Sequence, residues 1–207
     1  MNAVVSSPPV LQPVDVIDQL VGIAPGSALD QLRAQREQAR TQAQQSYLAL
    51  FAPTDSVAGH FEIADRFAVA AFVAGLHRQP DVARFYRETL AGKGVAQAIE
   101  TEVARGAAQG PYGRYPEGPL SVEDDVGPVY AVDDAHRAVF GERLSAGLAH
   151  AHLLVFHPRD ASPAALQALL DAGWRTTEIV TLSQLVAFLA FQIRVVIGLR
   201  ALVTTSA

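Results

Sequence analysis

Cysteine is absent from this chain of 207 residues. A chain without cysteine forms no disulfide, has no thiolate nucleophile and offers no thiolate ligand to a metal. Positive charge is also scarce, because 16 Lys and Arg residues stand against 21 Asp and Glu residues and leave a formal net charge of -5. Binding to nucleic acid requires a basic face that neutralises phosphates. The composition therefore predicts no nucleic-acid partner.

Charged residues make up only 18% of the chain, whereas hydrophobic residues make up 50%. A surplus of apolar side chains over what one core needs is typical of subunit interfaces, so we expect a homo-oligomer: a dimer, trimer or hexamer. The N-terminal residues lack the basic and apolar segments of a secretory signal. The longest uncharged apolar stretch, 179–193, is shorter than the roughly 18 residues of a membrane span. We expect a cytoplasmic protein without a membrane partner.

Apolar residues recur at helical spacing through most of the chain, and no segment shows the alternation of a strand. This pattern predicts an all-α fold of seven or eight helices in a single domain, 1–207, preceded by a mobile tail, 1–13. Proline, glycine and capping residues bound the expected helices. These helices cover 15–23, 28–51, 61–76, 80–90, 95–107, 134–156, 163–173 and 178–202. Gly141 and Gly147 are expected weak points in the sixth.

The segment 108–132 is too rich in glycine and proline for a regular element. A loop of this length inside a compact domain is usually functional or wraps around a neighbour. Tyr112, Tyr115 and Tyr130 favour an ordered role, since aromatic residues are scarce in disordered segments. Three alternatives remain open: an arm that packs against another subunit, a lid over a pocket, or a disordered connection.

Two stretches of the chain are ADRFAVAAFVAGLHRQPDVARFYRETL and, later, LQALLDAGWRTTEIVTLSQLVAFLAFQIRVVIGLRAL. Both resemble the carboxymuconolactone decarboxylase and alkylhydroperoxidase D superfamily. The front segment, DVIDQLVGIAPGSALDQLRAQREQARTQAQQSYLALFAP, is similar to the peroxidase-related branch of that superfamily. The resemblance covers about residues 14 to 203. It implies an orthogonal helical bundle of the alkylhydroperoxidase D type.

Peroxidase members of that superfamily carry Glu, two Cys and His in the spacing Glu-x11-Cys-x2-Cys-x3-His. With Asp65 at the Glu position, the Cys positions fall on His77 and Pro80, and the His position falls on Arg84. The thiol cycle requires two sulfurs that form a disulfide. The resemblance therefore places the active-site position at His77, but the composition excludes thiol-dependent peroxidase activity.

Five residues are candidates for a site in the corresponding cleft. His77 is a candidate general base, because histidine titrates near neutral pH; the alternative is that it only ends a helix. Asp65 precedes it by more than three turns, so the two would meet only through a substrate or a partner helix. We also expect Arg84, Gln192 and Arg194 to bind a ligand, with an ion pair from Arg194 to Asp65 or Glu62 as the structural alternative.

Three further histidines, His150, His152 and His157, lie close together in the sequence. Their spacing does not place them on one helical face, as a pair of metal ligands on a helix requires. We expect no metal and no cofactor.

Three functions follow as hypotheses. The first, which we favour, is a superfamily member without redox cysteines that binds a small ligand or acts structurally, with a cysteine-containing relative as a candidate partner. The second is an acid/base enzyme of the decarboxylase or isomerase type, acting on a small acidic or lactone molecule in the same cleft. The third is an assembly protein whose cleft is filled by Phe72, Phe85 or Phe188.

Overall fold

The computed structural model describes residues 14–53, 61–90 and 93–205. The structure is 72% helical, and the described residues contain no strand, which confirms the all-α prediction. The predicted tail, 1–13, lies outside the described residues. The α-helices are α1 (Val16–Val21), α2 (Ala28–Ala34), α3 (Glu37–Phe51), α4 (Ile63–Leu76), α5 (Pro80–Arg87), α6 (Lys93–Arg105), α7 (Asp134–Phe156), α8 (Pro163–Asp171) and α9 (Thr176–Thr205).

The predicted helix over 28–51 is in fact two helices, α2 and α3, so that prediction was wrong. The helix breaks at Arg36, whose backbone leaves the helical region at φ -122° and ψ 48°. The break lets arginines on both helices reach acidic residues of the N-terminal segment. The Arg33 guanidinium lies 2.7 Å from Asp15 and also pairs with Asp18, while Arg40 bonds Asp18 and, at 2.8 Å, Asp30.

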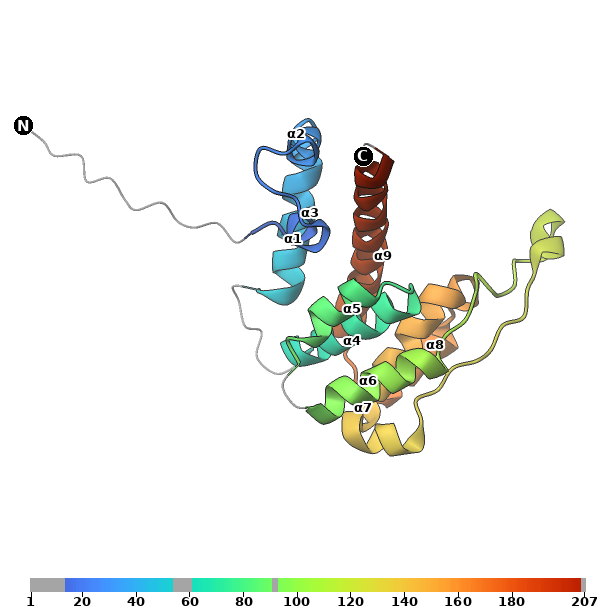
Figure 1. The fold of residues 1–207 in the computed structure, drawn as a ribbon. Helices are drawn as coiled ribbons and strands as arrows, with labels where there is room; N and C mark the ends of the chain where they lie inside the picture. The colour runs from blue at the N-terminus through green and yellow to red at the C-terminus, as the bar shows by residue number, and fades with distance from the viewer. Residues whose placement is uncertain (1–13, 54–60, 91–92, 206–207) are drawn as a thin grey trace, which may run out of the picture.

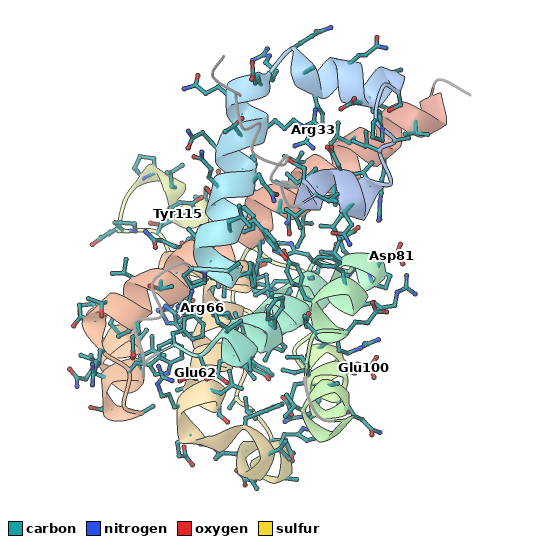
Figure 2. All side chains as sticks on the ribbon, turned by 90° about the vertical axis from the view of Figure 1, so that its left-hand side faces the viewer. Arg33, Glu62, Arg66, Asp81, Glu100 and Tyr115 are labelled. Atoms are coloured by element: carbon teal, nitrogen blue, oxygen red, sulfur yellow. The ribbon has the colours of Figure 1, made fainter. Side chains whose placement is uncertain are left out.

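Burial explains why this ion-pair network determines the local fold. The side chain of Arg33 is only 7% exposed and that of Asp18 only 9%. Figure 2 shows Arg33 among the three N-terminal helices. A buried charge is costly unless it is paired, so the local fold keeps these groups together. Helix propensity alone carried no information about this long-range pairing.

Helix α4 is the centre of the molecule. Every residue from Ala68 to Ala74 is buried, and the helix packs against α5, α6, α7 and α9. A helix that is apolar on all faces must be enclosed by neighbours, and α4 meets this requirement.

Helix α9 is the longest helix and runs past several others. It packs against α1, α3, α4, α7 and α8, and Figure 1 shows the N-terminal helices beside its C-terminal half. By length and composition, Thr176–Val203 is also apolar enough to cross a membrane, although core helices of soluble proteins share this property. Only 33% of its most apolar window is buried. The helix therefore has both a core face and an uncovered face.

The two glycines of α7 have different roles. Gly141 adopts φ 75°, a left-handed conformation that kinks the helix, as expected for a weak point. Gly147 is instead a packing position, because a Cβ atom there would lie 2.6 Å from the Trp174 ring. Glycine thus allows α7 and the connection between α8 and α9 to approach closely.

The loop 108–132 contacts the bundle at both ends, while its middle projects away from the helices (Figure 1). At its start, the Tyr112 amide donates to the Phe156 carbonyl over 2.6 Å. At its end, the Tyr130 hydroxyl donates to the buried Glu102 carboxylate over 2.6 Å. A short 3-10 helix, η1 (Pro119–Glu123), forms the projecting part. The two ends of the loop are therefore fixed parts of the fold.

Candidate functional site

The junction between α4 and α5 begins with the C-terminus of α4. His77 is the last residue before the chain turns, and Arg78 follows in the left-handed conformation with φ 57°. The amide of Arg78 donates to the Gly75 carbonyl and that of Gln79 to the Ala74 carbonyl, which is the bonding pattern of a Schellman motif. Glycine usually occupies the left-handed position, because other residues are strained there by roughly 1–2 kcal/mol. The junction is thus an ordered but strained turn.

His77 lines a cavity of about 560 Å³. We call it the His77 cavity. One wall is the end of α7, residues 154–156, and another is the loop at Gly110 and Pro111. The third wall is α9, through a face of small side chains that ends in a charged one: Ser183, Ala187, Ala190 and Arg194. The cavity is therefore mainly apolar, with an imidazole and a guanidinium as its ionisable groups.

The two ionisable groups of the His77 cavity influence each other. Burial lowers the pKa of His77 below its ordinary value of 6.5, and the positive charge of Arg194 lowers it further. The imidazole is therefore neutral at pH 7, and its buried Nε2 has no hydrogen-bond partner in the described part of the chain. Arg194 donates one hydrogen bond, to the Ala190 carbonyl over 2.8 Å. A neutral imidazole and a cation thus line the same space.

Arg194 has no acidic partner among the described residues, and the expected ion pair with Asp65 or Glu62 is not formed. Asp65 lies in the first turn of α4, at the opposite end from His77. Its carboxylate is 3.8 Å from the Arg143 guanidinium, which also contacts Glu178 at 3.1 Å. Burial raises the pKa of Asp65, and the charge of Arg143 opposes that rise. Asp65 therefore belongs to a separate polar cluster.

Gln192 and Arg84 lie apart from the His77 cavity. Gln192 is fully buried and accepts a 2.6 Å hydrogen bond from the Tyr86 hydroxyl, which ties α9 to α5. Arg84 pairs with Asp81 on the exposed side of α5. There it lines a second hollow of about 430 Å³, together with Arg78 and Arg87. Of the five candidates, the structure brings only His77 and Arg194 together.

None of the three phenylalanines expected to fill the cleft lines the His77 cavity. Phe72 is fully buried and packs against Tyr130 at a ring distance of 5.4 Å. Phe188 is buried in the core, and Phe85 packs edge-on against Tyr86. The space beside His77 therefore remains open.

Sequence reasoning predicted only His77 and Arg194 of the cavity wall and missed the rest, including Gly110, Pro111 and Ser183. Gly110 and Pro111 belong to the Gly/Pro-rich loop, whose length already indicated a functional role. Their partner on α7, Phe156, is too distant in sequence for any local pattern to predict the contact. Ser183 gave no signal because its hydroxyl donates to the Ile179 carbonyl, as serine often does within a helix.

No protein-family model, curated protein or solved structure matches this chain. The function is therefore inferred from the site itself.

Proposed function

We propose that this protein binds a small carboxylic acid with an apolar body in the His77 cavity. The observation that carries the proposal is that Arg194, which has no acidic partner among the described residues, and the neutral His77 line the same open and mostly apolar space. A guanidinium binds a carboxylate through charge-assisted hydrogen bonds. Apolar walls with a few polar groups are typical of small-molecule sites.

Each wall of the His77 cavity would contact a different part of the proposed ligand. Ala187 and Ala190 are small, so the α9 wall leaves room for a ring or a short chain. The Leu154 and Phe156 side of α7 would cover the apolar body, and Arg194 would hold the carboxylate at the other end. The imidazole of His77 would accept or donate a hydrogen bond to a second polar atom of the ligand.

The proposed family remains the carboxymuconolactone decarboxylase and alkylhydroperoxidase D superfamily, with this chain as a member that lacks the redox cysteines. In support, the chain is all-helical, and a cavity lies at the position that the alignment assigned to the first thiol of the peroxidases. The missing cysteines remove the thiol chemistry, so a binding role is consistent with both observations.

We also propose that the protein is a homo-oligomer joined through α9. The exposed residues of this helix recur at positions 180, 184, 187, 191 and 194, a spacing of three and four residues. This spacing places them in one stripe, the arrangement by which two helices pair side by side. Phe191, at 46% exposure, is the largest apolar residue on the stripe. A partner helix on the stripe would cover it and adjoin the His77 cavity, since Ala187 and Arg194 belong to both.

An acid/base enzyme remains a second candidate, because the unpartnered, neutral imidazole of His77 has the properties of a general base. A suitable probe is α-angelica lactone. Its conversion to the conjugated isomer requires only that a base removes a proton from the carbon next to the carbonyl and that a proton returns to the γ carbon. Catalysed isomerisation that is lost in His77→Gln would support this candidate, and a rate equal to the buffer rate would remove it.

The binding proposal is tested with a matched pair of probes, 4-propylbenzoate and 4-propylphenol. These molecules share an apolar body and differ in charge at pH 7. We expect the benzoate to shift the amide resonances of Ser183, Ala187 and Ala190 in two-dimensional NMR, and to bind there more tightly than the phenol. Equal affinity of the two probes at these amides, or no shift at all, would overturn the proposal.

A further inference from the structure

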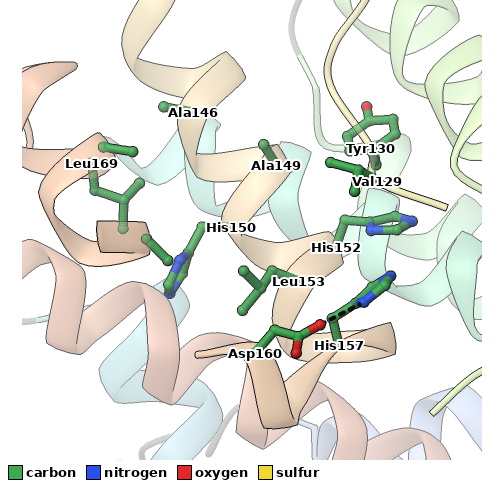
Figure 3. Close-up of a pocket in the computed structure, with 12 residues that line it drawn as sticks. Val129, Tyr130, Ala146, Ala149, His150, His152, Leu153, His157, Asp160 and Leu169 are labelled. Atoms are coloured by element: carbon green, nitrogen blue, oxygen red, sulfur yellow. Dashed lines mark hydrogen bonds and ion pairs between the residues drawn. The ribbon is translucent and has the colours of Figure 1, made fainter. Parts of the chain in front are cut away.

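Another cavity, of about 300 Å³, lies on a different side of α7 from the His77 cavity. It is bounded by α8 and the end of the long loop. We call it the His150 cavity. Its apolar lining includes Ala149, Leu153 and Leu169, and three imidazoles add to it: His150, His152 and His157. Figure 3 shows His150 and His152 pointing to opposite sides of α7, with Leu153 between them. Its volume is about twice that of an apolar protein cavity of ~150 Å³ that binds benzene.

Two of the three imidazoles have hydrogen-bond partners within the fold. His152 bonds the Gly106 carbonyl through Nε2 over 3.0 Å. His157 bonds Asp160 through Nδ1 and the Pro128 carbonyl through Nε2, each over 3.0 Å. These bonds fix the loop against α6 and α7, so both rings are structural parts of the cavity wall.

His150 differs from its neighbours. It is 6% exposed, yet within the described part of the chain neither ring nitrogen has a hydrogen bond. In contrast to Nε2 of His77, neither nitrogen is sealed from solvent, so the ring reaches the space of the cavity and can bond to a molecule there. The ring lines the cavity beside Leu169 (Figure 3). An occupant of the cavity would supply the missing partner.

The charge of the lining limits what that occupant can be. Within the described part of the chain, no lysine or arginine lines the His150 cavity, and its one carboxylate, Asp160, already pairs with the His157 imidazole at 3.0 Å. Burial lowers the pKa of His150, so the ring is neutral at pH 7 and adds no positive charge. An anion would be desolvated without a counter-charge, which is costly. A neutral hydroxyl, in contrast, donates readily to the free lone pair of a neutral imidazole.

We propose that the His150 cavity binds a neutral, mostly apolar molecule with a hydroxyl group, such as a small alkylphenol, with His150 as its hydrogen-bond partner. The site is independent of the proposed function, because it lies on another side of α7 and shares no lining residue with the His77 cavity. The two cavities therefore have opposite preferences for the charge of a ligand with the same apolar body.

The test uses 4-propylphenol and 4-propylbenzoate on the full chain, with binding followed by isothermal titration and by the amide resonances of Ala149, Leu153 and Leu169. We expect the phenol to shift these resonances and to bind there more tightly than the benzoate. His150→Phe removes the hydrogen bond and keeps a flat ring, so it should weaken phenol binding about 3- to 10-fold. His150→Gln retains a donor and an acceptor and should restore part of the affinity.

A second variant keeps the proposal falsifiable if changes at His150 disturb the fold. Ala168 lines the cavity but is exposed, so Ala168→Phe should block the cavity without altering the core. This variant should abolish phenol binding and leave benzoate binding at the His77 cavity unchanged. Arg194→Gln should weaken benzoate binding at the His77 cavity about 3- to 10-fold and leave phenol binding at the His150 cavity unchanged. Phenol binding that survives Ala168→Phe, or benzoate binding more tightly than phenol at the three amides, would overturn the proposal even if the His77 cavity binds its acid as expected.

Discussion

His77 at the end of α4 and Arg194 on α9 line one cavity, and the charge of Arg194 adds to burial in lowering the pKa of His77. Their two helices are far apart in sequence and pack against each other in the core. The cavity therefore contains a permanent cation, Arg194, and a neutral ring that forms hydrogen bonds, His77.

The first prediction concerns the cation. Arg194→Gln keeps hydrogen-bond donors but removes the charge, so 4-propylbenzoate should bind about 3- to 10-fold more weakly. The expected loss is smaller than for a buried charged hydrogen bond because Arg194 is exposed. Arg114→Gln is the control, since Arg114 is also exposed but lies on the projecting loop. Isothermal titration measures both, and equal losses in the two variants would contradict the assignment.

A second prediction concerns pH. Burial lowers the pKa of His77, His150 and His152 below 6.5. Below pH 6.5 the unfolded chain therefore binds protons that the folded protein does not, and the free energy of unfolding decreases as pH falls. We expect the urea midpoint to be highest above pH 6.5 and to fall between pH 6.5 and 5.5. His150→Gln should reduce this dependence, and a midpoint that rises in acid would contradict it.

The third prediction tests the strain at Arg78. Arg78→Gly relieves the left-handed conformation at φ 57° and should stabilise the protein by about 1 kcal/mol, less any loss of the weak 3.4 Å bond from Arg78 to the Ala108 carbonyl. Gln79→Gly is the matched control. Its φ of -112° suits any residue, so glycine there should cost about 0.5–1 kcal/mol. Chemical unfolding distinguishes the two, and destabilisation by both would show that the turn is not strained.

The sequence predicted those parts of the fold that depend on residues close together in the chain. It did not predict the parts that depend on contacts between distant residues. The bounds of α7 and the start of α5 followed from local signals, namely the helical spacing of apolar residues and a proline in the first turn. The division between α2 and α3 did not, because it depends on Arg33 and Arg40 reaching Asp15 and Asp18. The local spacing of apolar residues does not indicate ion pairs between residues that are distant in the chain.

In the candidate site, too, single residues could be predicted from local sequence, but the contacts between distant segments could not. His77 and Arg194 could be selected from sequence because each is a polar residue in an apolar helical context. Their common cavity depends on how α4, α7 and α9 pack, and so do the two cavity residues of the loop, Gly110 and Pro111. The histidine spacing on α7 showed that His150 and His152 diverge, but not that α8 encloses a space beside them.

The fourth prediction concerns assembly. Phe191→Glu places a charge in the exposed stripe of α9, so it should shift the protein to a lower oligomeric state in light scattering after gel filtration. Val139→Glu is the control, because Val139 has a similar exposure of 47% but lies on α7. The wild-type protein should be at least dimeric at micromolar concentration without detergent. A monomeric wild-type protein would contradict the prediction, and so would a need for lipid to keep it in solution.

The last prediction concerns the chemistry that the sequence resemblance would otherwise suggest. The purified protein should not reduce organic hydroperoxides with a dithiol above the buffer rate, because that cycle forms a sulfenic acid and then a disulfide, and the chain has no cysteine. His77 could polarise a peroxide, but an imidazole cannot accept the oxygen and be regenerated by a thiol.

The alignment itself is tested by His77→Cys with Pro80→Cys, two positions that bracket the turn between α4 and α5. If they correspond to the thiol pair of the peroxidases, the double variant should form an internal disulfide under mild oxidation, whereas Arg84→Cys with Pro80→Cys should not. Peroxidase activity in the unmodified, metal-free protein would disprove the cysteine argument, and failure of the double variant to form the disulfide would disprove the alignment.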